Sequence, residues 1–300
     1  MNENLSIRFG SLELSNPLVA VSGTFGYGFD YEPVIPPEIF GAIVVKGTSL
    51  EPWPGNPPPR IVETPAGMLN AIGLENPGVE VLVEEYLPRL AARDVRVIVN
   101  VVGKTVEEYV GVAGRLQGIE GVDALELNVS CPNVKAGGMS FGTSPAAVDN
   151  LVGAVRAATD APLIVKLTPN VTDIAEVARA AEEAGADAIS LINTLLGMAI
   201  DVDAGKPVLA NVMGGLSGPA VRPVALRCVY QVRAATSLPI LGLGGVASAE
   251  DVVAFIMAGA SAVGIGTALF ADPLAPRRIL SDLAAYRARY DEWPVGRAHL

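Results

Sequence analysis

Residues 126–143 read ELNVSCPNVKAGGMSFGT and continue an apolar run that begins at Val122. The β-branched and apolar residues from Val122 to Val129 predict a strand that is covered on both faces. Beyond Val129, prolines and glycines prevent regular structure over the next dozen positions, namely Pro132, Gly137, Gly138 and Gly142. Cys131 therefore stands just past the end of a buried strand, in a glycine-rich loop.

Outward from this strand, the chain alternates apolar strand candidates with amphipathic helical stretches. Eight strands are predicted, at Pro17–Val21, Ala42–Lys46, Val95–Val101, Val122–Val129, Leu163–Leu167, Ala186–Ile192, Pro239–Leu243 and Ala262–Ile265. Helical patterns occupy Val79–Ala92, Val106–Gln117, Pro145–Ala158, Ile174–Glu183, Pro219–Ala235, Ala249–Ala258 and Pro273–Tyr290. This alternation without a linker predicts an α/β fold, a single (β/α)8 TIM barrel over residues 1–300. A doubly wound sheet is the alternative fold.

Two segments fall outside the alternation. Leu5–Phe9 and Leu12–Leu14 predict an N-terminal hairpin. Ser49–Asn76, after the second strand, is rich in proline, which predicts a loop or short hairpin over one rim of the barrel.

Composition excludes several partners. The formal net charge is −11, with 21 basic residues that are scattered along the chain, which argues against nucleic acid and anionic membrane. Val252–Ala271 carries no charge, but its glycines divide it into a helix end, a strand and a turn, so we expect no membrane span. The N-terminus lacks a signal-peptide pattern, and the 2 cysteines, 97 positions apart, form no disulfide framework, which predicts a reducing cytoplasm.

Metal chemistry is not expected within this chain. The single histidine, His299, is the next-to-last residue, and the 2 cysteines are too few for an iron–sulfur cluster. A proton near neutral pH would then be moved by a thiol, a lysine or a carboxylate.

Polar residues stand at most of the predicted strand ends. Because the site of such a barrel lies at the carboxyl ends of its strands, we expect them to meet there. In strand order they are Lys46-Gly47-Thr48, Asn100, Asn128 with Cys131, Lys166 with Thr168, Asn193-Thr194, Gly244-Gly245 and Gly266-Thr267.

The glycine pairs after the last two strands suit a phosphate group held on backbone amides, as in FMN. Gly242 and Gly244 formally match a dinucleotide fingerprint, but no acidic residue follows at the expected distance, so NAD binding there is rejected. Lys166 could place positive charge near a flavin ring or, alternatively, form a Schiff base. Cys131 is either a thiolate base or a small buried hydrophobic residue.

Several motifs together resemble class 1 dihydroorotate dehydrogenases, and the form of the first two is most similar to the class 1B catalytic subunit. They are Ser22-Gly23-Thr24-Phe25-Gly26, Asn70-Ala71-Ile72-Gly73-Leu74, Asn128-Val129-Ser130-Cys131-Pro132-Asn133, Lys166-Leu167-Thr168-Pro169-Asn170, Ile192-Asn193-Thr194, Gly215-Leu216-Ser217-Gly218 and Gly244-Gly245-Val246. One departure is Trp53, where relatives usually have arginine.

The resemblance implies that Cys131 takes the proton from C5 of dihydroorotate while hydride from C6 passes to FMN. It implies substrate contacts from Lys46, Asn70, Ala71, Ile72, Gly73, Leu74, Asn128, Asn133, Asn193 and Thr194. It implies FMN contacts from Ser22, Lys46, Gly47, Asn100, Asn128, Lys166, Ile192, Gly218, Gly244, Gly245, Gly266 and Thr267.

The resemblance also implies a homodimer that joins a second subunit, carrying FAD and a [2Fe–2S] cluster, into a heterotetramer that passes electrons to NAD. The alternatives are a class 1A enzyme that uses fumarate and another FMN barrel that acts on dihydropyrimidines. A colourless aldolase or isomerase that uses Lys46 or Lys166 is the alternative from a different class.

Overall fold

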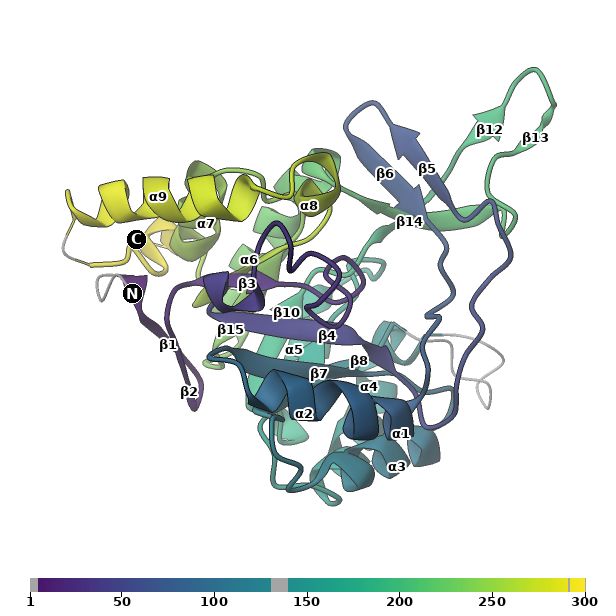
Figure 1. The fold of residues 1–300 in the computed structure, drawn as a ribbon, viewed down its shortest axis with the longest axis horizontal. Helices are drawn as coiled ribbons and strands as arrows, with labels where there is room; N and C mark the ends of the chain where they lie inside the picture. Colours follow the sequence, from purple (N-terminus) through teal and green to yellow (C-terminus); the bar gives the residue numbers. More distant parts are fainter. Residues whose placement is uncertain (1–4, 131–139, 291, 300) are drawn as a thin grey trace.

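A computed structural model of the chain describes residues 5–130, 140–290 and 292–299 (Figure 1). Eight parallel strands close into a barrel in the order β10-β15-β16-β3-β4-β7-β8-β9. This confirms the predicted (β/α)8 barrel, and the doubly wound alternative is wrong. The strands are β3 (Leu18–Ala20), β4 (Ala42–Thr48), β7 (Arg96–Val101), β8 (Ala124–Asn128), β9 (Leu163–Lys166), β10 (Ala188–Leu191), β15 (Ile240–Leu243) and β16 (Ala262–Ile265).

Helices cover the outside of the barrel at nearly the predicted positions. The stretch expected over Val79–Ala92 is divided into α1 (Val79–Val81), a π-helical turn over Leu82–Tyr86, and α2 (Leu87–Ala91). The remaining helices are α3 (Val106–Leu116), α4 (Pro145–Arg156), α5 (Ile174–Glu183), α6 (Arg222–Ala235), α7 (Ala249–Met257), α8 (Ala268–Ala271) and α9 (Ala275–Arg287).

Strand β8 shows how the barrel separates its two faces. Leu125 and Leu127 belong to the large apolar cluster between the barrel and its helices, whereas Ala124 belongs to the cluster inside the barrel. Since side chains alternate along a strand, Glu126 and Asn128 share the inner face with Ala124. The inner face therefore changes from apolar to polar toward the carboxyl end of β8.

The N-terminal hairpin is confirmed and closes the other end of the barrel. Strands β1 (Ile7–Phe9) and β2 (Leu12–Leu14) pair antiparallel. Phe9, Leu12 and Leu14 pack in the same apolar cluster as the interior residues of β4, β7 and β8. The polar end is therefore the end that remains for a ligand.

The proline-rich insertion contains the hairpin of β5 (Ile61–Thr64) and β6 (Gly67–Asn70). This hairpin joins β14 (Met213–Ser217) and β11 (Leu195–Met198) in a four-stranded antiparallel sheet of order β11-β14-β6-β5. A further hairpin, β12 (Ile200–Asp201) and β13 (Lys206–Pro207), continues beyond that sheet. We call this unit the arm; Figure 1 shows it projecting from the barrel. The hairpin was predicted, but the part over residues 195–217 was not.

The uncharged stretch from Val252 to Ala271 is divided as predicted. It contains most of α7, then Gly259, strand β16 and helix α8. Over the described ranges, the chain has no helix that is both long and apolar enough to cross a membrane.

Candidate active site

A cavity of about 570 Å³ opens at the carboxyl ends of the barrel strands, under the arm. Its size lies within the usual range for small-molecule sites, roughly 300–1,000 Å³. Cys131 and Asn133 lie outside the described residues. Every other residue predicted for substrate or cofactor lines this cavity, namely Ser22, Lys46, Gly47, Asn70, Ala71, Ile72, Gly73, Leu74, Asn100, Asn128, Lys166, Ile192, Asn193, Thr194, Gly218, Gly244, Gly245, Gly266 and Thr267.

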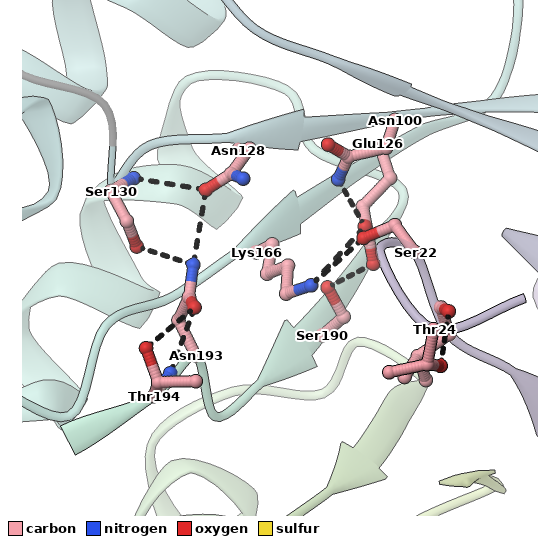
Figure 2. Close-up of polar contacts among 11 residues, drawn as sticks. Ser22, Thr24, Asn100, Glu126, Asn128, Ser130, Lys166, Ser190, Asn193 and Thr194 are labelled. Atoms are coloured by element: carbon pink, nitrogen blue, oxygen red, sulfur yellow. Dashed lines mark hydrogen bonds and ion pairs between the residues drawn. The ribbon is translucent and has the colours of Figure 1, made fainter. Parts of the chain in front are cut away.

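Two side-chain amides meet beside the end of β8 (Figure 2). Asn193 donates from Nδ2 to Asn128 Oδ1 at 3.2 Å and to Ser130 Oγ at 2.9 Å. Its Oδ1 accepts from the backbone N–H of Thr194 at 2.8 Å. These bonds fix how both amides are turned, so the cavity wall presents defined donors and acceptors.

The arm supplies a third amide from the opposite side. Asn70 ends β6, where it pairs with Gly215 of β14, and its Nδ2 donates to Gly215 O at 3.4 Å. Asn70 is therefore held by an antiparallel sheet, while Asn128 is held by the parallel barrel. The cavity is thus built from parts far apart in the sequence.

Two lysines bring positive charge to the cavity. Lys166, at the end of β9, is 6% exposed, and its Nζ lies 3.3 Å from Ser22 Oγ and 3.9 Å from Glu126 Oε2. Lys46 ends the regular part of β4, and within the described residues its ammonium makes no ion pair. A ligand with a carboxylate or an electron-rich ring would be stabilised by both charges.

The loop after β15 approaches the end of β14 closely. Gly245 has φ of +77°, and a Cβ there would lie 2.7 Å from Gly218 O. Gly218 lines the cavity and directly precedes the helical run that continues into α6. Only a residue without Cβ fits at position 245, and the resulting cradle leaves backbone close to the cavity.

These features fit FMN. The glycines that line the cavity after β14, β15 and β16 leave room for its phosphate, and the amides and Lys166 suit the polar edge of a flavin ring. The residues present therefore match the group that the sequence predicted, although their individual roles stay predictions.

Some residues at the site were not predicted. Glu126 and Ser190 lie beneath the cavity, and Glu126 bonds to Asn100 and Ser190. Arg60 and Glu75 form an ion pair at 2.6 Å and both line the cavity. Alternation with Asn128 would have placed Glu126 inside the barrel, whereas the Arg60–Glu75 pair depends on loop geometry that no local pattern gives.

Other polar residues lie outside the cavity lining. The hydroxyl of Thr168, at the fifth strand end, accepts from the backbone N–H and the Nδ2 of Asn170. His299 stacks on Tyr230 with ring centroids 3.9 Å apart, on the outer side of α6. Helix α5 is capped by Asp173, whose side chain accepts from Ala175 N. Thr105 and Ser248 cap α3 and α7.

The fold and cavity define a class first: an α/β barrel with a ligand site at its strand ends, built for an anionic or phosphate-bearing ligand. Comparison with known sequences then narrows the class. A sequence model described as "Dihydroorotate dehydrogenase" matches residues 4–286, and the chain belongs to this family.

Close relatives share most of their length with this chain. The dihydroorotate dehydrogenase B (NAD(+)) catalytic subunit of Desulforamulus reducens is 55% identical over 286 residues, which cover 95% of this chain and 94% of the relative. The protein of the same name from Pelobacter propionicus is 56% identical, covering 93% and 92%. That from Alkaliphilus oremlandii is 53% identical, covering 96% and 95%.

Proposed function

We propose that this chain is the catalytic subunit of an NAD-linked dihydroorotate dehydrogenase, which oxidises dihydroorotate to orotate in pyrimidine biosynthesis. The observation that carries the proposal is identity above 50%, over more than 90% of both chains, with catalytic subunits of that name. The cavity lined by all the described candidate residues supports it. Residues 1–300 are taken as one FMN-binding domain.

FMN, when bound, supplies the two-electron acceptor. Ser22, Asn100, Lys166 and the glycines after β15 and β16 would hold it. Lys166 would place a positive charge near the ring edge where negative charge develops when a flavin is reduced. The buried surroundings of Lys166 make that charge more effective than it would be in water.

Dihydroorotate carries carbonyl and N–H groups and one carboxylate. Asn70, Asn128 and Asn193 offer both donors and acceptors to the ring, and the ammonium of Lys46, which has no ion pair within the described residues, offers a partner for the carboxylate. In the proposed step, the C5 proton goes to Cys131 and the C6 hydrogen leaves with its electron pair. A C5=C6 double bond forms, which balances the loss of one proton and one hydride.

NAD-linked turnover requires a partner. The relatives are named catalytic subunits, and we propose an electron-transfer subunit with FAD and a [2Fe–2S] cluster. We also propose a homodimer within a heterotetramer, located in the cytoplasm. The arm exposes four apolar side chains close together in the sequence, between 47% and 85% of each, which supports a subunit contact there; they are Leu196, Met198, Ile200 and Val202.

An acceptor panel tests the proposal. The purified chain, loaded with FMN, is given dihydroorotate and either NAD⁺, fumarate or a redox dye, and orotate formation is measured. We expect turnover with the dye, and with NAD⁺ only after the electron-transfer subunit is added. Efficient fumarate reduction would instead indicate the class 1A alternative, and turnover of dihydrouracil but not dihydroorotate would indicate another dihydropyrimidine enzyme.

A further inference from the structure

Glu126 is a charged residue in the middle of a strand that is otherwise fully enclosed. It is 1% exposed, and it lies one inward position before Asn128 on β8. A buried carboxylate is costly unless it is paired and hydrogen-bonded. Its partners therefore indicate what keeps it in the barrel.

Both oxygens of Glu126 have partners (Figure 2). Oε1 accepts from Ser190 Oγ at 2.8 Å, and Oε2 accepts from Asn100 Nδ2 at 2.5 Å. Oε2 also lies 3.9 Å from Lys166 Nζ. Asn100 and Lys166 line the cavity, whereas Glu126 lies below it, so Glu126 reaches the site only through these two residues.

The bond to Asn100 fixes the direction of that amide. A carboxylate only accepts, so the Asn100 NH₂ group must face Glu126, and Oδ1 must turn away. Oδ1 accordingly lies beside Gly47 in the cavity wall, 3.1 Å from the position of a Cβ there. Asn100 thus presents an acceptor, and selects an N–H, at this part of the cavity.

The ion pair with Lys166 has a different effect. The negative charge of Glu126 partly offsets the positive charge of Lys166, and the pair is shielded from water. Ser22, which also lies beside Lys166 Nζ, is neutral and adds no charge. We infer that Glu126 is a positioning residue that orients Asn100 and sets the electrostatic effect of Lys166 on the bound flavin. The inference rests on the proposed flavin function.

The test compares Glu126→Gln with Ser190→Ala. Ser190→Ala removes a hydrogen bond to Glu126 and keeps the charge, whereas Glu126→Gln removes the charge. In the FMN-loaded protein we expect Glu126→Gln to shift the flavin reduction potential to more positive values and to raise the Kd of FMN. Ser190→Ala should lower the thermal midpoint and leave the potential unchanged. Glu126→Asp, which keeps the negative charge, should have the same flavin reduction potential as the wild type.

Two results would overturn the inference: an unchanged potential in Glu126→Gln, or an equal shift in Ser190→Ala. A second measurement needs no flavin. Unfolding midpoints of the apo-protein are measured for Glu126→Gln, Lys166→Met and the double variant. We expect the double variant to lose less stability than the two single losses summed, and strict additivity would contradict the pairing.

If the wild-type chain binds no FMN, the proposed function fails, and the apo-protein cycle decides the pairing alone. If Glu126→Gln does not fold, two other measurements decide the inference. They are the flavin reduction potential of Glu126→Asp and the stability of the double variant relative to Lys166→Met. The two failures are therefore distinguishable.

Discussion

The two cysteines provide a matched pair of variants. Cys131 is the proposed base, whereas Cys228 lies on α6, 1% exposed, where burial raises the pKa of its thiol. We expect Cys131→Ser to bind FMN and orotate but to slow flavin reduction at neutral pH about 10²–10⁴-fold, because a serine hydroxyl is a poor base. Stopped-flow absorbance measures the rate. Cys228→Ala should react as the wild type does, and an unchanged rate in Cys131→Ser would return Cys131 to a packing role.

Gly245 and Gly153 differ in what a Cβ would meet. At position 245 it meets Gly218 O at 2.7 Å and φ is +77°, whereas at position 153, on α4, it meets nothing within 4 Å. We expect Gly245→Ala to weaken FMN binding at least tenfold, as measured by fluorescence titration. Gly153→Ala should keep the affinity and raise stability by about 1 kcal/mol. Equal FMN affinities in the two variants would contradict the glycine cradle.

At the residue scale, the polar residues at the strand ends could be predicted as a group. A (β/α)8 barrel brings the carboxyl ends of all its strands to the same end of the barrel. Lys46, Asn100, Asn128 and Lys166 needed only their position after an apolar run. Glu126 was not predicted as a site residue, because its neighbours Leu125 and Leu127 made the strand appear uniformly apolar. The hydrogen bonds that orient Asn100 and Asn128 involve residues from other parts of the barrel, so they cannot be deduced from the sequence of a single strand.

A buried hydrogen bond joins helix α3 to strand β8. The hydroxyl of Tyr109, on α3, donates to Asn128 O at 2.6 Å. We expect Tyr109→Phe to lower the free energy of unfolding by about 1–3 kcal/mol, since the carbonyl loses a buried partner, and to weaken orotate binding. Urea denaturation and orotate titration measure both. Tyr290→Phe, at a half-exposed ring, should change neither. Equal free energies of unfolding for Tyr109→Phe and the wild type would show that this hydrogen bond does not stabilise the protein.

A carboxylate–guanidinium cluster joins the turn before β4 to the loop after α2. The pKa of Glu38 is lowered mainly by its hydrogen bonds with Arg93. Since the folded pKa lies below its ordinary value of 4.5, the stabilisation is present above that pH and is lost as pH falls through the folded pKa. Glu38→Gln should therefore reduce the thermal midpoint at pH 7, and this deficit should shrink as the pH falls below 4.5. Glu85→Gln, at an exposed residue, is the control; a deficit that keeps its full size as the pH falls below 4.5 would contradict the assignment.

At the scale of elements, local patterns were sufficient for the barrel and insufficient for the arm. Most barrel strands are short apolar runs followed by an amphipathic helix, so the order of elements could be predicted. Strand β14 pairs with β6, whose Asn70 lies 145 positions before Gly215 in the sequence. Its sequence, Met213-Gly-Gly-Leu-Ser217, has no alternation that would mark a strand.

The whole molecule combines a barrel with an exposed apolar arm. If the arm is a subunit contact, charges at Ile200 and Val202 should lower the oligomeric order without reducing FMN affinity. Light scattering after size exclusion compares Ile200→Asp/Val202→Asp with the wild type. The matched control is Val295→Asp, an exposed apolar residue outside the arm. A wild-type monomer, or an oligomer that the double variant leaves intact, would contradict the contact.

The central claim is that this barrel oxidises dihydroorotate on a bound flavin. The most direct measurement is a single turnover without oxygen: the chain is reconstituted with FMN, mixed with dihydroorotate, and followed by flavin absorbance and orotate formation. We expect one FMN per chain, loss of the oxidised flavin band and one orotate per flavin. A chain that stays colourless after FMN is added, or a flavin that remains oxidised with excess dihydroorotate, would contradict the claim.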